Sequence, residues 1–274
     1  MYSTVGLGNI SIHESTIKGK CRMTTEEKYI FDLQGYLVIK NVLSDEELTK
    51  LNRIADEKFP YGKEEAHREW SMLHWGKPVK RLIDHPKIVP YLVELMGECF
   101  RLDHDYCIFM NENETRGGLH GGGGGGGGGW NGTHFYHCHN GVMRNGLSVL
   151  TYFLTDAPQG AGGFVCVPGS HKSNFPNQDI PGEVRGLKRP VHYVMQPEAK
   201  AGDALFFTEA LVHGTSAWTA KTERRTLLFK YIPGHSAWFE QSQYYDFDKI
   251  GELTERQKRV LAPASIHEHL PVVE

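Results

Sequence analysis

The hydrophobic pattern of the first hundred residues is mainly helical. Two segments open with a capping box, in which paired side chains close the first turn of a helix: Thr24 with Glu27, and Ser44 with Glu47. The apolar run YLVIKNVL lies between them and predicts a strand. The segment HPKIVPYLVELMGECF predicts a further helix, with Pro86 near its start and Gly97 near its end.

The pattern changes at about residue 103 to short apolar runs separated by Gly, Pro, Asn and Asp. These runs are DYCIFMNE, LSVLTYFLTDA, GGFVCVPGSH, VHYVMQP, DALFFTEALVHG and RTLLFKYIPG. Many short strands without intervening helices predict an antiparallel sandwich or jelly roll. We therefore expect one mainly β domain over residues 1–274, with a mostly helical N-terminal elaboration (1–100), a jelly-roll core (101–235) and a partly helical C-terminal segment (236–274).

Composition and charge exclude several classes of protein. Among the 274 residues, 39% are hydrophobic, which is enough for a large core, and the formal net charge of −3 gives no basic excess for binding nucleic acid. The five cysteines have no paired spacing and argue against a disulfide framework. The N-terminus has no signal-like apolar region, and no run approaches the ~20 apolar residues that cross a bilayer. These features predict a cytoplasmic protein without a membrane partner.

A histidine followed by a glycine tract is the most unusual feature of the sequence. His120 stands directly before nine consecutive glycines, Gly121–Gly129. Residues without a Cβ atom lose the most entropy on ordering and bury no side chain, so this tract is predicted to be a loop. Two interpretations stay open: a flexible lid beside a ligand site, or a low-complexity or placeholder tract.

Most of the fifteen histidines are expected to be ordinary surface or core residues. His137 and His139 alternate along a predicted strand and could chelate a metal, but no acidic or cysteine ligand lies close in sequence, so substrate contact or loop packing is favoured. His213 ends an apolar strand, and Arg224 follows on the next one. Imidazole suits Fe(II) and a guanidinium grips a carboxylate, so these two residues are the stronger candidates.

Five segments carry a family resemblance: GYLVIKNVLSDEEL, GFVCVPGSHKSNFP, GDALFF, LVHGT and RRTLL. Over roughly residues 25–235, the chain resembles the phytanoyl-CoA dioxygenase branch of the Fe(II)/2-oxoglutarate oxygenases. The resemblance implies a cupin-like double-stranded β-helix, a small-molecule substrate, and Fe(II), 2-oxoglutarate and O2 as cofactors. It places His120 and His213 at the iron, Arg224 (or Arg225, if the register differs by one) at the C5 carboxylate of 2-oxoglutarate, and Thr215 and Tyr152 at further cosubstrate contacts.

The chain departs from this family at one iron ligand. The family pattern is His-x-Asp, whereas this chain has His120-Gly121-Gly122, and glycine has no donor atom. Halogenases of the same superfamily show this departure, with chloride bound to iron where the carboxylate would be. The resemblance thus implies a halogenase of an unactivated C–H bond, with the halide at Gly122.

The substrate of such a halogenase is less defined by the sequence. The chain is similar in character to the halogenases of 2′-deoxyadenosine monophosphate in antibiotic biosynthesis, which makes an anionic nucleotide one alternative. The candidate substrate contacts are His137, His139 and Lys172.

Two other functions compete with halogenation. A hydroxylase of a small acid or acyl thioester would recruit its carboxylate from elsewhere, with Glu209 and Asp156 as candidates. A jelly-roll binding protein with a decayed metal site is the third hypothesis. The presence of His120, His213 and Arg224 together argues against the third.

Overall fold

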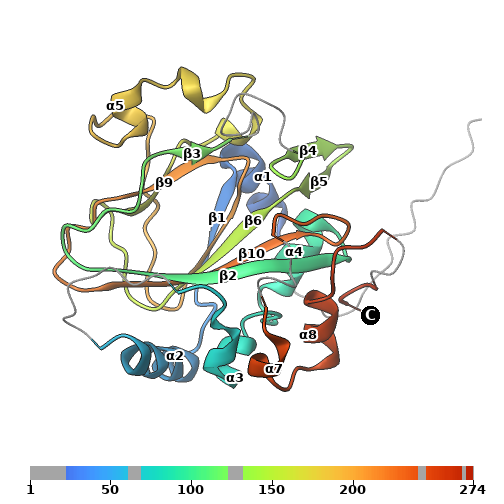
Figure 1. The fold of residues 1–274 in the computed structure, drawn as a ribbon. Helices are drawn as coiled ribbons and strands as arrows, with labels where there is room; N and C mark the ends of the chain where they lie inside the picture. The colour runs from blue at the N-terminus through green and yellow to red at the C-terminus, as the bar shows by residue number, and fades with distance from the viewer. Residues whose placement is uncertain (1–22, 61–68, 123–131, 240–244, 267–269, 274) are drawn as a thin grey trace, which may run out of the picture.

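The computed structural model describes residues 23–60, 69–122, 132–239, 245–266 and 270–273. Two antiparallel sheets form its centre: a five-stranded sheet in the order β1-β8-β6-β10-β2 and a three-stranded sheet in the order β3-β9-β7 (Figure 1). A separate hairpin pairs β4 with β5. The predicted mainly β, jelly-roll fold with flanking helices is confirmed.

The strands vary from two to eleven residues in length. Those of the larger sheet are β1 (Tyr36–Ile39), β2 (Phe100–Met110), β6 (Ser148–Phe153), β8 (Ala204–Thr208) and β10 (Arg224–Pro233). Those of the smaller sheet and the hairpin are β3 (His120–Gly121), β7 (Gly163–Cys166), β9 (Val212–Ser216), β4 (Tyr136–His139) and β5 (Val142–Asn145).

Most helices pack on the outer face of the five-stranded sheet. Figure 1 shows α2, α3, α7 and α8 along that face, and α5 on the opposite side of the molecule near β3 and β9. The helices are α1 (Thr25–Gln34), α2 (Asp45–Lys58), α3 (Lys77–Lys80), α4 (Val89–Met96), α5 (Gly182–Arg185), α7 (Phe247–Ile250) and α8 (Glu255–Val260), with 3-10 turns η1 (Met72–Trp75), η2 (Ser170–Lys172) and η3 (Asn177–Asp179). In the described ranges, no helix has the length and apolar character needed to cross a membrane.

The predicted helix starts are confirmed by their caps. Thr24 and Glu27 form a reciprocal capping box at α1, and Ser44 and Glu47 form one at α2, so local side chains satisfy the first amides of both helices. The third predicted helix corresponds to α4, which has Pro90 rather than Pro86 in its first turn and has Gly97 as its C-terminal cap, as expected. A proline in the first turn removes only an amide that has no partner inside the helix.

Alternation along β10 decides which side chains face the space between the sheets. Leu227 and Phe229 join the outer core beneath the helices, whereas Leu228 joins the inner core together with residues of β7. Since successive side chains point to opposite faces, Arg224 and Lys230 lie on the inner side with Leu228. This strand therefore delivers two cations into the interior.

The expectation of a strand at VHYVMQP is wrong. Residues 191–197 make only an isolated bridge, between Met195 and Cys166. Val191, Tyr193 and Val194 instead pack against a small apolar cluster that includes Val212 of β9. The apolar residues of this segment cover the outer face of the smaller sheet, which gives them burial without strand pairing.

Candidate functional site

Two histidines from separate segments meet on the smaller sheet. The register of β3 and β9 sets His120 directly opposite His213. Their ring centroids lie 4.4 Å apart with an interplanar angle of 55°. His213 is buried against Phe164 and Phe207, whereas His120 reaches the surface. The pair therefore lies where the interior meets solvent.

Backbone carbonyls orient both imidazoles in the same way. His120 Nδ1 donates to the Gly118 carbonyl at 2.9 Å, and His213 Nδ1 donates to the Leu211 carbonyl at 2.8 Å. A ring that donates through Nδ1 keeps the lone pair on Nε2, the arrangement usual for metal-bound histidine. Burial lowers the pKa of His213 to about 4, so this ring is neutral at physiological pH and can act as a ligand without losing a proton.

Glycine is required where the chain leaves His120. Gly121 and Gly122 have φ angles of +77° and +94°, and a Cβ atom at Gly121 would lie 2.7 Å from the Leu211 carbonyl oxygen. The Gly122 amide donates to the Glu209 carbonyl at 3.1 Å. The start of the glycine tract is thus held against the β8–β9 turn, while residues 123–129, on which the lid hypothesis depends, lie outside the described part of the chain.

A buried carboxylate lies beside His213. Glu209 Oε2 is 3.8 Å from His213 Nε2, and its other oxygen accepts a hydrogen bond from Lys230 Nζ at 2.6 Å. Burial raises the pKa of Glu209, but the positive Lys230 and the neighbouring His213 hold it well below its ordinary value. Glu209 is therefore ionised, and Lys230 is its principal partner.

The described residues contain no ready-made site with three or more His, Cys, Asp or Glu ligands for a metal. Asp156, the other carboxylate considered from the sequence, is exposed after β6 and accepts a hydrogen bond from the Ala201 amide at 2.8 Å. The structure thus brings Glu209, and not Asp156, to the histidine pair.

Arg224 is a buried cation that forms no ion pair with any described residue. Within the described ranges its guanidinium makes no ion pair, its Nε has no hydrogen-bond partner, and its Nη1 lies 3.7 Å from the sulfur of Met110. Burial lowers its pKa to about 10, which reflects the cost of an isolated charge in the interior. An anion that entered this space would remove that cost.

A second glycine makes the space for this guanidinium. A Cβ atom on Gly163 of β7 would lie 2.6 Å from Arg224 Nε, and the φ angle of +80° at Gly163 also favours glycine. Gly163 is three residues from Cys166, which pairs with His213. At about 3.3 Å per residue, Arg224 thus lies about 10 Å along the sheet from the histidine pair.

Of the other predicted cosubstrate residues, Thr215 faces the same side as His213, whereas Tyr152 and Arg225 face the outer side of the five-stranded sheet. Thr215 is two residues after His213 on β9 and shares its face of the strand. Tyr152 is not brought to the site, because it faces the outer core and donates to the Leu82 carbonyl at 2.9 Å. Arg225 also points away from Arg224, toward Glu223 and Asp56.

The predicted substrate contacts do not gather at the histidine pair. His137 and His139 are exposed on β4, and Lys172 pairs with Asp32 of α1 at 2.9 Å. Lys230, which the sequence did not single out, is closer, because it pairs with Glu209 beside His213. His134 was also missed: burial lowers its pKa, and the charges of Glu209, Lys230 and His120 also act on it. A lysine at an inward position of an apolar strand was the feature that could have indicated Lys230.

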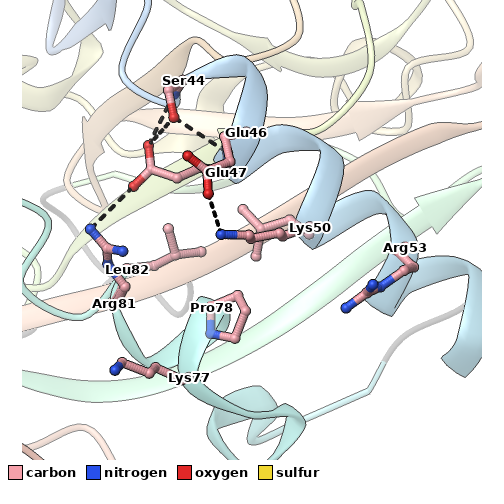
Figure 2. Close-up of a pocket in the computed structure, with 10 residues that line it drawn as sticks. Ser44, Glu46, Glu47, Lys50, Arg53, Lys77, Pro78, Arg81 and Leu82 are labelled. Atoms are coloured by element: carbon pink, nitrogen blue, oxygen red, sulfur yellow. Dashed lines mark hydrogen bonds and ion pairs between the residues drawn. The ribbon is translucent and has the colours of Figure 1, made fainter.

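A separate groove lies on the helical side of the molecule. This groove has a volume of about 500 Å³ and lies between α2 and the α3 region. Figure 2 shows Lys50 directed to Glu46 and Arg81 directed to Glu47 along it. These helices cover the outer face of the five-stranded sheet, so the groove is separated from the histidine pair by that sheet.

Comparison with known proteins supports the same fold. The family model described as phytanoyl-CoA dioxygenase (PhyH) matches residues 129–226, a range that includes His213 and Arg224 but not His120. No curated protein matches the chain by sequence.

Several solved structures are similar in three dimensions. HygX from Streptomyces hygroscopicus, with nickel and 2-oxoglutarate bound, has a TM-score of 0.71 at 22% identity, over 84% of this chain and 94% of its own. The non-heme alpha ketoglutarate dependent carbocyclase SnoK from nogalamycin biosynthesis has a TM-score of 0.59 at 18% identity, over 79% and 88%. EctD from S. alaskensis, in its apoform, has a TM-score of 0.57 at 15% identity, over 77% of each chain.

Proposed function

We propose that this protein is an Fe(II)- and 2-oxoglutarate-dependent enzyme that oxidises a C–H bond of a small molecule. The observation that carries the proposal is the placement of two oriented imidazoles, His120 and His213, on the side of the smaller sheet that faces Arg224, a buried cation that pairs with no acidic group among the described residues. The family match and the similarity to folds that hold nickel or iron together with 2-oxoglutarate support it.

The residues present fit both groups. The Nε2 atoms of His120 and His213 each have a lone pair suitable for binding Fe(II). The Arg224 guanidinium, which has room because Gly163 has no Cβ atom, is suited to binding a carboxylate. Arg224 lies about 10 Å along the sheet from the histidine pair, a separation that suits a short dicarboxylate bound to Arg224 at one end and to the metal at the other. When bound, iron and 2-oxoglutarate together would supply the oxidising power by reducing O2.

Replacing Arg224 with glutamine should raise the KM for 2-oxoglutarate by about 30-fold or more, because truncating one partner of a buried charge pair costs roughly 2–5 kcal/mol. Arg225→Gln is the matched control, since Arg225 pairs with Glu223 and Asp56 on the other face and should leave this KM unchanged. Steady-state 2-oxoglutarate consumption measures both. The same defect in Arg225→Gln, or none in Arg224→Gln, would move the carboxylate site.

The finer assignment that we propose is halogenation. Gly122 stands at the position of the family carboxylate, and because glycine has no side chain it offers no carboxylate oxygen to bind iron. Chloride would take that position, and the substrate would receive chlorine in place of hydroxyl. Gly122 and chloride therefore belong to the proposed reaction centre, together with His120 and His213.

A hydroxylase is the second candidate, and one observation favours it. Glu209 Oε2 lies 3.8 Å from His213 Nε2, so a modest rotation could turn this carboxylate to a metal held by the two histidines. The hydrogen bond to Lys230 opposes that rotation. The two candidates thus differ in which negative group completes the metal site, chloride or Glu209.

Chloride dependence should separate these two candidates. Purified enzyme with Fe(II), 2-oxoglutarate and O2 is incubated with a metabolite mixture, with chloride present or replaced by a non-coordinating anion, and products are identified by mass spectrometry. We expect chlorinated product only with chloride. Hydroxylated product at equal rate without chloride would reject halogenation.

Iron affinity of a Glu209 variant provides a second comparison. The double variant Glu209→Gln/Lys230→Gln keeps the interior neutral, and under halogenation it should retain Fe(II) binding. A loss of Fe(II) affinity in this variant would favour the hydroxylase, because Glu209 would then be a ligand.

A further inference from the structure

Aromatic side chains surround the polar residues beside the histidine pair. Trp70 lies 5.0 Å from Tyr106 and 5.9 Å from Phe239 between ring centroids, and Lys230 Nζ lies 5.6 Å from the centroid of Tyr106. Trp238, the neighbour of Phe239, stacks on His134 at 4.8 Å. We call Trp70, Tyr106, Trp238 and Phe239 the aromatic group.

Much of this aromatic surface is exposed. Trp70, Trp238 and Phe239 keep 40%, 47% and 37% of their surfaces open to solvent, although each contacts other rings. Asp103 accepts hydrogen bonds from the backbone amides of Trp238 and Phe239, so their positions are fixed by a buried carboxylate. Rigid, exposed aromatic faces are typical of surfaces that bind a flat or ring-shaped ligand.

The polar residues among these rings carry no net charge. Lys230 and Glu209 neutralise each other through a 2.6 Å contact, and the Lys230 side chain keeps 14% of its surface exposed. An anionic ligand such as a phosphate would need a cation without a partner here, and Lys230 is already paired. The charges therefore favour a neutral ligand with groups that hydrogen-bond.

His134 adds an independent indication of a ligand. It is only 8% exposed, and both its ring nitrogens are buried without a hydrogen-bond partner in the described part of the chain. Buried polar atoms normally have partners, and an imidazole offers one donor and one acceptor. Its ring stacks on Trp238 with 4.8 Å between centroids, so it lies on the same surface as the aromatic group.

We propose that this surface binds a neutral, polyhydroxylated ring, the chemistry of a saccharide or cyclitol, with a ring face on the aromatic group and hydroxyls bonded to His134 and to the Lys230–Glu209 pair. Such a ring has an apolar C–H face for aromatic stacking and hydroxyls for the polar residues. The proposal rests on the proposed function, because it makes this ring the substrate whose C–H bond is presented to the His120–His213 centre.

Direct binding tests this assignment. The full chain, loaded anaerobically with Fe(II) and 2-oxoglutarate, is titrated with maltose, 2′-deoxyadenosine monophosphate and cyclohexanol, and binding is followed by ligand-observed NMR. Maltose should bind more tightly than the other two. Tighter binding of the nucleotide would overturn the neutral-ligand inference, and tighter binding of cyclohexanol would overturn the role of multiple hydroxyls.

Variants locate the binding surface. His134→Phe should weaken maltose binding about tenfold, the ratio expected for losing hydrogen bonds to a buried group. Trp238→Ala, at a half-exposed position that spares the core, should weaken it similarly, while His139→Phe on exposed β4 is the matched control. If His134→Phe and Trp238→Ala bind maltose as tightly as His139→Phe does, the proposal is overturned.

A measurement of metal binding distinguishes failure of the saccharide proposal from failure of the proposed enzymatic function. The visible absorption of the Fe(II)–2-oxoglutarate complex is recorded on each sample before titration. Intact absorption without maltose binding overturns the ligand assignment alone. Maltose binding without that absorption overturns the proposed function, and with it the claim that the bound ring is its substrate.

Discussion

Replacing either His120 or His213 with alanine is expected to abolish turnover and to lower Fe(II) affinity by more than about 100-fold. Loss of a residue that only orients a metal ligand already lowers metal affinity by up to about 100-fold, and loss of the ligand itself should cost more. The two rings face each other at 4.4 Å, with both Nε2 lone pairs available. Neither Gly121 nor Gly122, the residues that follow His120, has a side chain that can replace a lost imidazole. Anaerobic titration with Fe(II) and 2-oxoglutarate, followed by visible absorption, measures the loss directly.

The control for this experiment is His137→Ala. His137 is exposed on β4 and stacks only on Phe135 among the described rings, so its removal should leave both Fe(II) affinity and turnover unchanged. His213 is buried, and its variant therefore also needs a thermal unfolding curve to show that the fold persists. Full iron affinity in folded His120→Ala or His213→Ala would remove the metal centre from this sheet.

Local features of the sequence predicted the elements well. The capping boxes at Thr24 and Ser44 act within four residues, so their helices start where expected. The segment VHYVMQP failed as a strand because a short apolar run has the same pattern whether it pairs in a sheet or covers one. That choice depends on tertiary packing, which the run itself does not encode.

The candidate site was predictable only in part, for reasons of register. Tyr152 and Arg225 each sit one position from an inward-facing neighbour, and a one-residue difference moves a side chain to the opposite face of a sheet. His134 and Lys230 become relevant only because β10 and the segment before β4 come to lie near Glu209, in a different part of the sequence. Spacing within one segment contains no information about such contacts.

The largest change in reaction outcome is expected from Gly122→Asp. Under the halogenase proposal, an aspartate here would supply an oxygen ligand, repel chloride by its charge and occupy the chloride position. Chlorinated product should disappear, with weak hydroxylation or an inactive site in its place, because a ligand misplaced by ~1 Å can cost about a hundredfold in rate. Product masses measured with and without chloride give the result.

The backbone at this position makes a second variant necessary. Gly122 has a φ angle of +94°, and a Cβ atom would lie 3.2 Å from Val212 Cγ2, so any side chain strains the turn beside His120. Gly122→Ala carries the same strain without an oxygen, and it should lose rate yet still require chloride and still give chlorinated product. The difference between the two variants therefore isolates the carboxylate. Loss of the chlorinated product in both variants to the same extent would show that the glycine serves the turn alone, and a wild-type enzyme that hydroxylates equally well without halide would reject halogenation in favour of the hydroxylase.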